Sequence, residues 1–135
     1  MMPDEPVFNA FKSRGGWRRI TGALRYSLAG LRSAWKHEHA FRQEVAVIVP
    51  AAVIALLLPV TALEKLLLVA SMVLVLVVEL LNSAIEAVVD RVSLERHPLS
   101  KNAKDFGSAA VMLALLLSAA CWVVVLWGWW QGRIA

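Results

Sequence analysis

The chain contains little cysteine, which limits the covalent and metal chemistry open to it. Cys121 is the only cysteine among the 135 residues. No disulfide can therefore form within the chain, and no cysteine-based metal site can be read from the sequence. Because Cys121 lies inside a long apolar run, we expect it to be a small buried side chain.

Two further absences narrow the class of protein. The segment from Met1 to Lys36 has no apolar core of the length that a cleavable signal peptide requires, so we expect the chain to be retained whole. The chain also has no glycine-rich phosphate loop of the P-loop or protein-kinase kind. Any phosphoryl transfer must therefore rely on basic side chains and a bridging metal ion for charge neutralisation.

Apolar sequence is what the chain has in excess. Its residues are 59% hydrophobic and its mean hydropathy is +0.64, far above the needs of a soluble domain of this size. Three segments, at residues 45–63, 66–89 and 109–130, can each cross a hydrocarbon core of roughly 30 Å, which takes about 20 helical residues. We expect Pro59 to end or kink the first segment. Three helices are too few to enclose a site alone, so the sequence predicts a homo-oligomer.

Basic residues are distributed unequally about these segments. The part up to Gln43 and the loop at residues 91–104 hold twelve lysines and arginines, against two on the opposite side, Lys65 and Arg133. The positive-inside rule then predicts a cytoplasmic N-terminus and an external C-terminus, where a tryptophan cluster anchors the third span. Topology and attraction to anionic lipid account for the formal net charge of +4, so we expect no nucleic-acid partner.

An amphipathic pattern precedes the first span, in residues 17–43. Apolar residues recur there at three- and four-residue intervals, with basic residues along one flank, while Arg19 and Tyr26 point away from the apolar stripe. The pattern predicts an interfacial helix on the cytoplasmic leaflet, and a simple membrane anchor remains an equally open interpretation. We expect residues 1–14 to be a loose tail. The stripe consists of Trp17, Ile20, Leu24, Leu28, Leu31 and Trp35.

One face of the second apolar segment is acidic. On a helix of 3.6 residues per turn, Glu79, Glu86 and Asp90 fall within roughly 40° of one another. Asn82 lies about 40° to 80° round from them. Carboxylates in a bilayer usually face a protein interior or a wet cavity, where they mark an ion, proton or substrate site. Polar packing between helices is the structural alternative, but two carboxylates a heptad apart plus an amide favour a site.

Depth in the membrane separates the chemistry of the two glutamates. From Leu66 on the outer side, Glu79 comes after roughly 20 Å and Glu86 after roughly 30 Å of helix. A group at the first depth can meet the hydroxyl of a membrane lipid. A carboxylate at the second can hold Mg²⁺, which prefers one or two carboxylates plus phosphate oxygens and water. Lys104, in the following loop, is a good partner for phosphates, although a Lys-Asp pair alone is more often solvated charge.

Three runs of residues carry a resemblance to a known family. They are EHAFRQE at 38–44, ELLNSAIEAVVDR at 79–91 and AKDFGSAAV at 103–111. These runs resemble the prokaryotic integral-membrane diacylglycerol kinase family, and the resemblance extends from about Arg19 to Trp127. It implies an all-α homotrimer in the bacterial inner membrane, with one surface helix and three transmembrane helices per chain. It also implies that MgATP is used to phosphorylate the primary hydroxyl of diacylglycerol, giving phosphatidate.

The resemblance also implies roles for individual residues. Glu79 matches the catalytic base that accepts the proton of the lipid hydroxyl, and Glu38 and Glu86 match the ligands of the metal that bridges the ATP phosphates. Nucleotide-contacting positions are Arg19, Tyr26, Glu38, Glu86, Glu95, Arg96, His97, Lys104 and Asp105. Lipid-contacting positions are Arg19, Glu79, Ser108 and Trp122. Asn82 and Asp90 match supporting polar positions.

Two other functions stay open at this point. Undecaprenol kinases share the architecture and the Glu and Asn pattern, although the run from Arg42 to Glu44 favours the diacylglycerol branch. A small proton-coupled exporter would also place an acid in the membrane. It would not need Glu38, Lys104 and Asp105 together at the cytoplasmic face, and it usually needs a fourth span. By the family resemblance, we expect residues 1–135 to form a single membrane kinase domain.

Overall fold

The computed structural model describes residues 16–134, and every regular element in that range is an α-helix. The helices are α1 (Gly16–His37), α2 (His39–Leu57), α3 (Ala62–Val92) and α4 (Pro98–Ile134). Helices α2, α3 and α4 are each long and apolar enough to cross a membrane, which confirms the predicted class of an all-α membrane protein. The predicted loose tail at 1–14 lies outside the described residues. The chain divides after Ser33 into two compact units, and the second contains these three helices.

The predicted amphipathic helix corresponds to α1. All six members of its apolar stripe, from Trp17 to Trp35, are exposed. A continuous exposed row of this kind is what a helix at a membrane interface presents to lipid. Arg25 lies over the ring of Tyr26, with 5.6 Å from its guanidinium carbon to the ring centroid.

The predicted surface region at 17–43 is not one continuous helix, because the chain breaks between α1 and α2. Glu38 has an extended backbone, with φ −99° and ψ 112°, and α2 begins at the next residue. The Arg42 guanidinium donates hydrogen bonds to the carbonyls of Trp35, at 3.0 Å, and Lys36, at 3.2 Å. These are carbonyls that the end of a helix leaves unpaired, so Arg42 stabilises the break.

The turn between α2 and α3 also differs from the predicted span at 45–63, since α2 ends at Leu57. Thr61 and Glu64 form a reciprocal capping box, in which each side chain accepts a hydrogen bond from the other's backbone N–H. A capping box fixes the start of a helix, so α3 begins at Ala62. Lys65 donates a hydrogen bond of 2.7 Å to the carbonyl of Leu56 and closes the turn from the other side.

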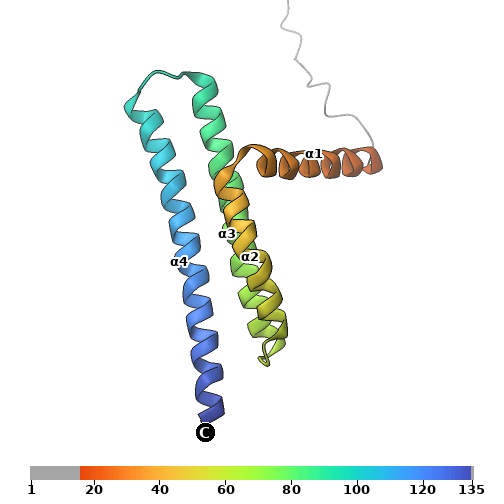
Figure 1. Ribbon diagram of the computed structural model, residues 1–135. Coiled ribbons are helices and arrows are strands. Elements are labelled where there is room, and N and C mark those ends of the chain that lie inside the picture. The colour runs from red at the N-terminus through yellow and green to blue at the C-terminus, as the bar shows by residue number, and fades with distance from the viewer. Residues whose placement is uncertain (1–15, 135) are drawn as a thin grey trace, which may run out of the picture. The chain divides into compact units, whose positions relative to one another are not determined.

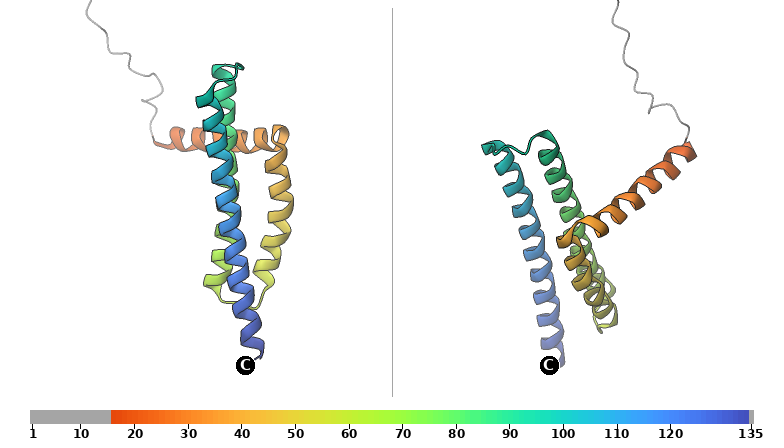
Figure 2. Two further views of the ribbon diagram at one scale, coloured as in Figure 1. Left: turned by 90° about the vertical axis from the view of Figure 1, so that its left-hand side faces the viewer. Right: turned by 45° about the horizontal axis from the view of Figure 1, so that its top comes forward.

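Helix α3 packs against both α4 and α2, and the three helices run antiparallel to their neighbours in sequence (Figures 1 and 2). Its buried face follows alternating steps of four and three residues, the spacing of a helix packed in a bundle. We call this row the α3 stripe. Its buried members are Leu68, Met72, Val75, Glu79 and Asn82, and Glu86 and Val89 continue it half-buried.

Helix α4 has a matching row with the same spacing, here called the α4 stripe. It consists of Gly107, Val111, Ala114, Ser118, Cys121 and Val125, all buried or half-buried. Small residues along such a row let two helix backbones approach closely, which is how helices associate in lipid. Cys121 is half-buried here, packed against the apolar cluster of Ala55, Leu68 and Val125.

A pair of buried serines connects the two helices near the middle of the bundle. Ser71 donates to the Leu68 carbonyl at 2.8 Å, so Ser118 must donate in the 3.2 Å contact between the two hydroxyl oxygens. We expect Ser118→Ala to lower the free energy of unfolding by about 0.6 kcal/mol, the average for a hydrogen bond between membrane helices. Unfolding by SDS in mixed micelles measures this. A Ser118→Ala variant as stable as the parent would contradict it.

Candidate active site

The acidic face of α3 lies within the packed bundle rather than on its lipid surface. Glu79 is 4% exposed and Asn82 is 9% exposed, and both occupy the α3 stripe, which is otherwise apolar toward its start. Glu86 is half-buried one heptad after Glu79, and Asp90 is exposed one turn later. The face therefore runs from the interior to the α3–α4 end of the bundle. A charged group can reach water at one end of this face and is shielded from it at the other.

Two more carboxylates approach Glu79 from the start of α2. Glu79 interacts electrostatically with Glu86 and with Glu38, at the break before α2. Glu44, one turn and a half into α2, also interacts with Glu79. Helix α2 is antiparallel to α3 and has 19 residues against 31, so its first turns lie beside the middle of α3, where Glu79 is placed.

Glu44 is a further acid near this face that the sequence pattern alone does not single out as a site residue. Its Oε2 atom is buried and has no hydrogen-bond partner among the described residues. Unpaired buried carboxylate oxygens are costly and point to a missing partner. The sequence signal for Glu44 is an acid directly followed by the apolar run from Val45.

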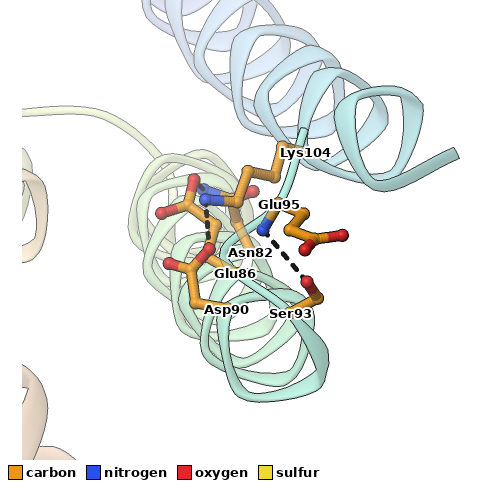
Figure 3. Close-up of polar contacts among 6 residues, drawn as sticks. All are labelled: Asn82, Glu86, Asp90, Ser93, Glu95 and Lys104. Atoms are coloured by element: carbon orange, nitrogen blue, oxygen red, sulfur yellow. Dashed lines mark hydrogen bonds and ion pairs between the residues drawn. The ribbon is translucent and has the colours of Figure 1, made fainter. Parts of the chain in front are cut away.

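Asn82 connects the buried and the accessible parts of the acidic face. Its Nδ2 donates a hydrogen bond of 3.3 Å to Oε1 of Glu86. One carboxylate oxygen of Glu86 is therefore occupied by the amide, and Oε2 is left for another partner. Figure 3 shows both side chains gathered on α3 beneath the start of α4.

Lys104 supplies a positive charge from α4. Its Nζ lies 2.7 Å from Oδ1 of Asp90, and it also interacts electrostatically with Glu86. Figure 3 shows the lysine reaching across from α4 to the acidic face. Lys104 precedes the predicted span at 109–130, and its ion pair with Asp90 ties the start of α4 to the acidic face.

A cavity of about 630 Å³ opens at the α3–α4 connection, beside this ion pair. Its lining includes four of the predicted nucleotide-contacting residues together with the supporting residue Asp90. The connection is shaped locally by two side chains: Ser93 accepts from the Glu95 backbone at 3.0 Å, and the His97 ring accepts from the Leu99 backbone at 3.2 Å. The four nucleotide-contacting residues in the lining are Glu95, Arg96, His97 and Lys104.

Asp105 and Ser108 are placed differently from Lys104. Asp105 is exposed and forms an ion pair with Lys101 one turn earlier on α4, so the adjacent Lys104 and Asp105 do not pair with each other. Ser108 is exposed on α4, directly after the buried Gly107. Within one chain, neither side chain faces the cavity.

The remaining predicted residues lie apart from this cluster or in the other unit. Trp122 packs against the apolar cluster that contains Leu68, and Leu68 precedes Glu79 by roughly 16 Å of helix. Arg19 and Tyr26 are exposed on α1 and lie on one face of it, seven residues apart.

The donors at this site suit a metal that needs few protein ligands. Among residues 16–134, no group of three His, Cys, Asp or Glu side chains is close enough to hold a metal ion. Mg²⁺ does not require such a group, because one or two carboxylates with phosphate oxygens and water satisfy it. The oxygen of Glu86 that Asn82 leaves free, together with Glu38, which approaches Glu79 from the start of α2, would meet that requirement.

Fold and site together define an integral membrane protein with a carboxylate-rich polar site at one end of a three-helix bundle. Comparison with known proteins identifies the group more closely. Residues 25–126 match the prokaryotic diacylglycerol kinase family, and the chain belongs to this family. The three spans and the family make it a bacterial membrane protein.

Individual relatives match over most of their length. Diacylglycerol kinase of Escherichia coli strain K12 is 52% identical over 112 residues, which cover 83% of this chain and 92% of the relative. Diacylglycerol kinase of Pseudomonas aeruginosa strain PAO1 is 54% identical over 118 residues, 87% of this chain and 96% of the relative. The Haemophilus influenzae diacylglycerol kinase is 44% identical over 116 residues. The resemblance stated from the three sequence runs is thus confirmed, and the exporter and undecaprenol kinase alternatives are not favoured.

Proposed function

We propose that this chain transfers the γ-phosphate of ATP to the primary hydroxyl of diacylglycerol, giving phosphatidate. Family membership and the printed names of the relatives support the reaction. The structural observation that carries it is the acidic face of α3, with buried Glu79 at one end and Lys104 of α4 at the other. Along that face, the hydroxyl of a membrane lipid and the phosphates of a water-soluble nucleotide can come together.

Glu79 is the catalytic base in this proposal. Its carboxylate takes the proton of the lipid hydroxyl as the oxygen forms its bond to the γ-phosphorus, and the bond from that phosphorus to the bridging oxygen of ADP breaks. Burial keeps water away from the carboxylate, where water would compete with the lipid hydroxyl as the acceptor of the phosphoryl group. A positioned base of this kind contributes about 10²- to 10⁴-fold to the rate.

Glu86 and Glu38 are the proposed ligands of Mg²⁺. When bound, the ion would neutralise charge on the ATP phosphates during transfer. Asn82 holds one oxygen of Glu86 and so fixes the direction of the other. Asp90 holds Lys104 near the same face, where the ammonium can meet a phosphate.

The cavity at the α3–α4 connection is the proposed nucleotide site. Its lining combines the cations of Arg96 and Lys104 with acceptors on Glu95 and His97, a set that can bind phosphate and ribose or base together. Arg19, Tyr26 and Asp105 complete the nucleotide contacts by resemblance. Arg19, Ser108 and Trp122 are assigned to the lipid side on the same basis.

Assembly and topology are part of the proposal. Most apolar side chains of α2, α3 and α4 are exposed in one chain, and the site residues Ser108 and Asp105 face outward. A homotrimer, as the family resemblance implies, would bring such residues to a neighbour's site. The base count supports a topology with the N-terminus and the α3–α4 connection in the cytoplasm and the C-terminus in the periplasm.

Purified protein in mixed micelles with radiolabelled ATP tests the proposal. Diacylglycerol and undecaprenol are supplied in parallel, with Mg²⁺ and with EDTA. We expect labelled phosphatidate as the main product and no product in EDTA. Undecaprenyl phosphate as the main product would show that undecaprenol, and not diacylglycerol, is the lipid acceptor. No product from either lipid would refute the kinase reaction.

A further inference from the structure

Gly107 is the residue of the α4 stripe that lies opposite Asn82. A Cβ atom built on Gly107 would overlap Asn82 Oδ1 and lie only 3.1 Å from its Cγ. The Asn82 amide therefore packs directly against the backbone of α4 at Gly107. At five other glycines within residues 16–134, namely Gly16, Gly22, Gly30, Gly128 and Gly132, a Cβ would meet nothing within 4 Å.

The position of Gly107 follows from the register of the bundle. Asn82 comes 11 residues after Ser71 on α3, and Gly107 comes 11 residues before Ser118 on antiparallel α4. Eleven residues are close to three helical turns, so the Asn82–Gly107 contact and the Ser71–Ser118 contact lie on the same line of packing. Because glycine is a poor residue within a helix, its presence at this point of the line calls for a local reason.

The reason lies in the orientation of the Asn82 amide. Its Oδ1 is buried without a hydrogen-bond partner among the described residues, facing the Gly107 backbone, while its Nδ2 donates to Glu86. Exchanging the two ends of the amide would set two oxygens against each other at Glu86. A side chain at position 107 would overlap the amide and displace it from this position, which would disturb its contact with Glu86.

We infer that Gly107 is a positioning residue, which aims the Glu86 carboxylate through Asn82. Gly107 touches no reacting group itself. It lets the Asn82 amide lie against the backbone of α4, and the amide in turn holds Oε1 of Glu86. The activity readout of this inference rests on the proposed role of Glu86 in the kinase reaction.

The first test is Gly107→Ala, with Gly128→Ala on the same helix as the matched control. Alanine is the better helix former at both positions, so neither variant is expected to unfold more easily for lack of propensity. We expect the Mg²⁺ concentration for half-maximal rate to rise about 10-fold or more in Gly107→Ala, as for other residues that orient a metal ligand. It should stay within about twofold in Gly128→Ala. An unchanged Mg²⁺ requirement in folded Gly107→Ala would overturn the inference.

A double variant separates positioning from general packing. In Asn82→Ala the amide is already gone, so adding Gly107→Ala should raise the Mg²⁺ requirement no further. If the increase in the Mg²⁺ requirement of the double variant equalled the product of the two single increases, Gly107 would not act through Asn82. The double variant also serves if Gly107→Ala alone fails to fold, because it removes the atoms that the new methyl would strike.

A spectroscopic test is independent of catalysis. The chain has three asparagines, Asn9, Asn82 and Asn102, so the Asn82 side-chain NH₂ signals can be assigned in ¹⁵N-asparagine-labelled protein by loss in Asn82→Ala. They should shift in Gly107→Ala and not in Gly128→Ala. Identical Asn82 signals in the parent and Gly107→Ala would overturn the inference. If the parent protein phosphorylated no lipid, the proposed function would fail while these spectra still decided the role of Gly107.

Discussion

Replacement of Glu79 by glutamine is expected to abolish turnover while leaving nucleotide binding largely intact. Glutamine keeps the size of the side chain and loses the capacity to accept a proton, so packing in the α3 stripe is retained. The loss should be at least about 10³-fold in rate, within the range found for positioned bases. Glu79 lies inside the bundle, whereas the cavity proposed for the nucleotide is lined by residues from Val89 onward.

The measurement combines the micellar kinase assay with binding of a fluorescent ATP analogue. Glu64→Gln on the same helix is the control, because Glu64 lies at the other end of α3 in the capping box, a role that glutamine also fills. The control should keep the parent rate. A Glu79→Gln variant with a normal rate would remove Glu79 from the mechanism, and one that also failed to bind nucleotide would show that the two halves of the site are not separable.

The course of the helices was predictable where apolar residues repeat, and less so at the helix ends. Hydropathy alone places three spans because backbone polar groups in lipid must pair within a helix. It does not show where a helix stops in water. Helix α4 starts at Pro98, eleven residues before the predicted span at 109–130, because its polar first turns continue as helix outside the hydrocarbon. The end of α2 depended on the Thr61 cap and Lys65, which hydropathy does not register.

The composition of the acidic face was predictable because Glu79, Glu86 and Asp90 repeat on one side of a single helix. Contacts between helices were not, since they depend on the register of α3 against α4. Lys104 and Asp105 are neighbours in sequence, yet their partners are Asp90 and Lys101. The approach of Glu44 to Glu79 likewise required the antiparallel placement of α2, and the close approach of Gly107 to Asn82 required the small residues of the α4 stripe.

Replacement of Glu86 by glutamine should raise the Mg²⁺ concentration needed for half-maximal rate by at least about 10-fold, because loss of a group that only supports a metal ligand already costs about 10- to 100-fold. Glutamine can still accept the hydrogen bond from Asn82 through its carbonyl oxygen, so the local packing survives while the negative charge is lost. Binding of a divalent cation by a neutral amide is much weaker than by a carboxylate.

The control for Glu86 is Asp90→Asn, one turn further along the same face. Asp90 pairs with Lys104 and has no proposed metal contact, so its loss should lower the affinity for ATP and leave the Mg²⁺ requirement at saturating ATP unchanged. Glu86→Asp, which keeps the charge on a shorter side chain, should fall between the parent and Glu86→Gln. Titration of Mg²⁺ at fixed, saturating ATP measures all three variants. An unchanged titration in Glu86→Gln would exclude Glu86 as a ligand, because removing one of two carboxylates from a hard cation must weaken its binding.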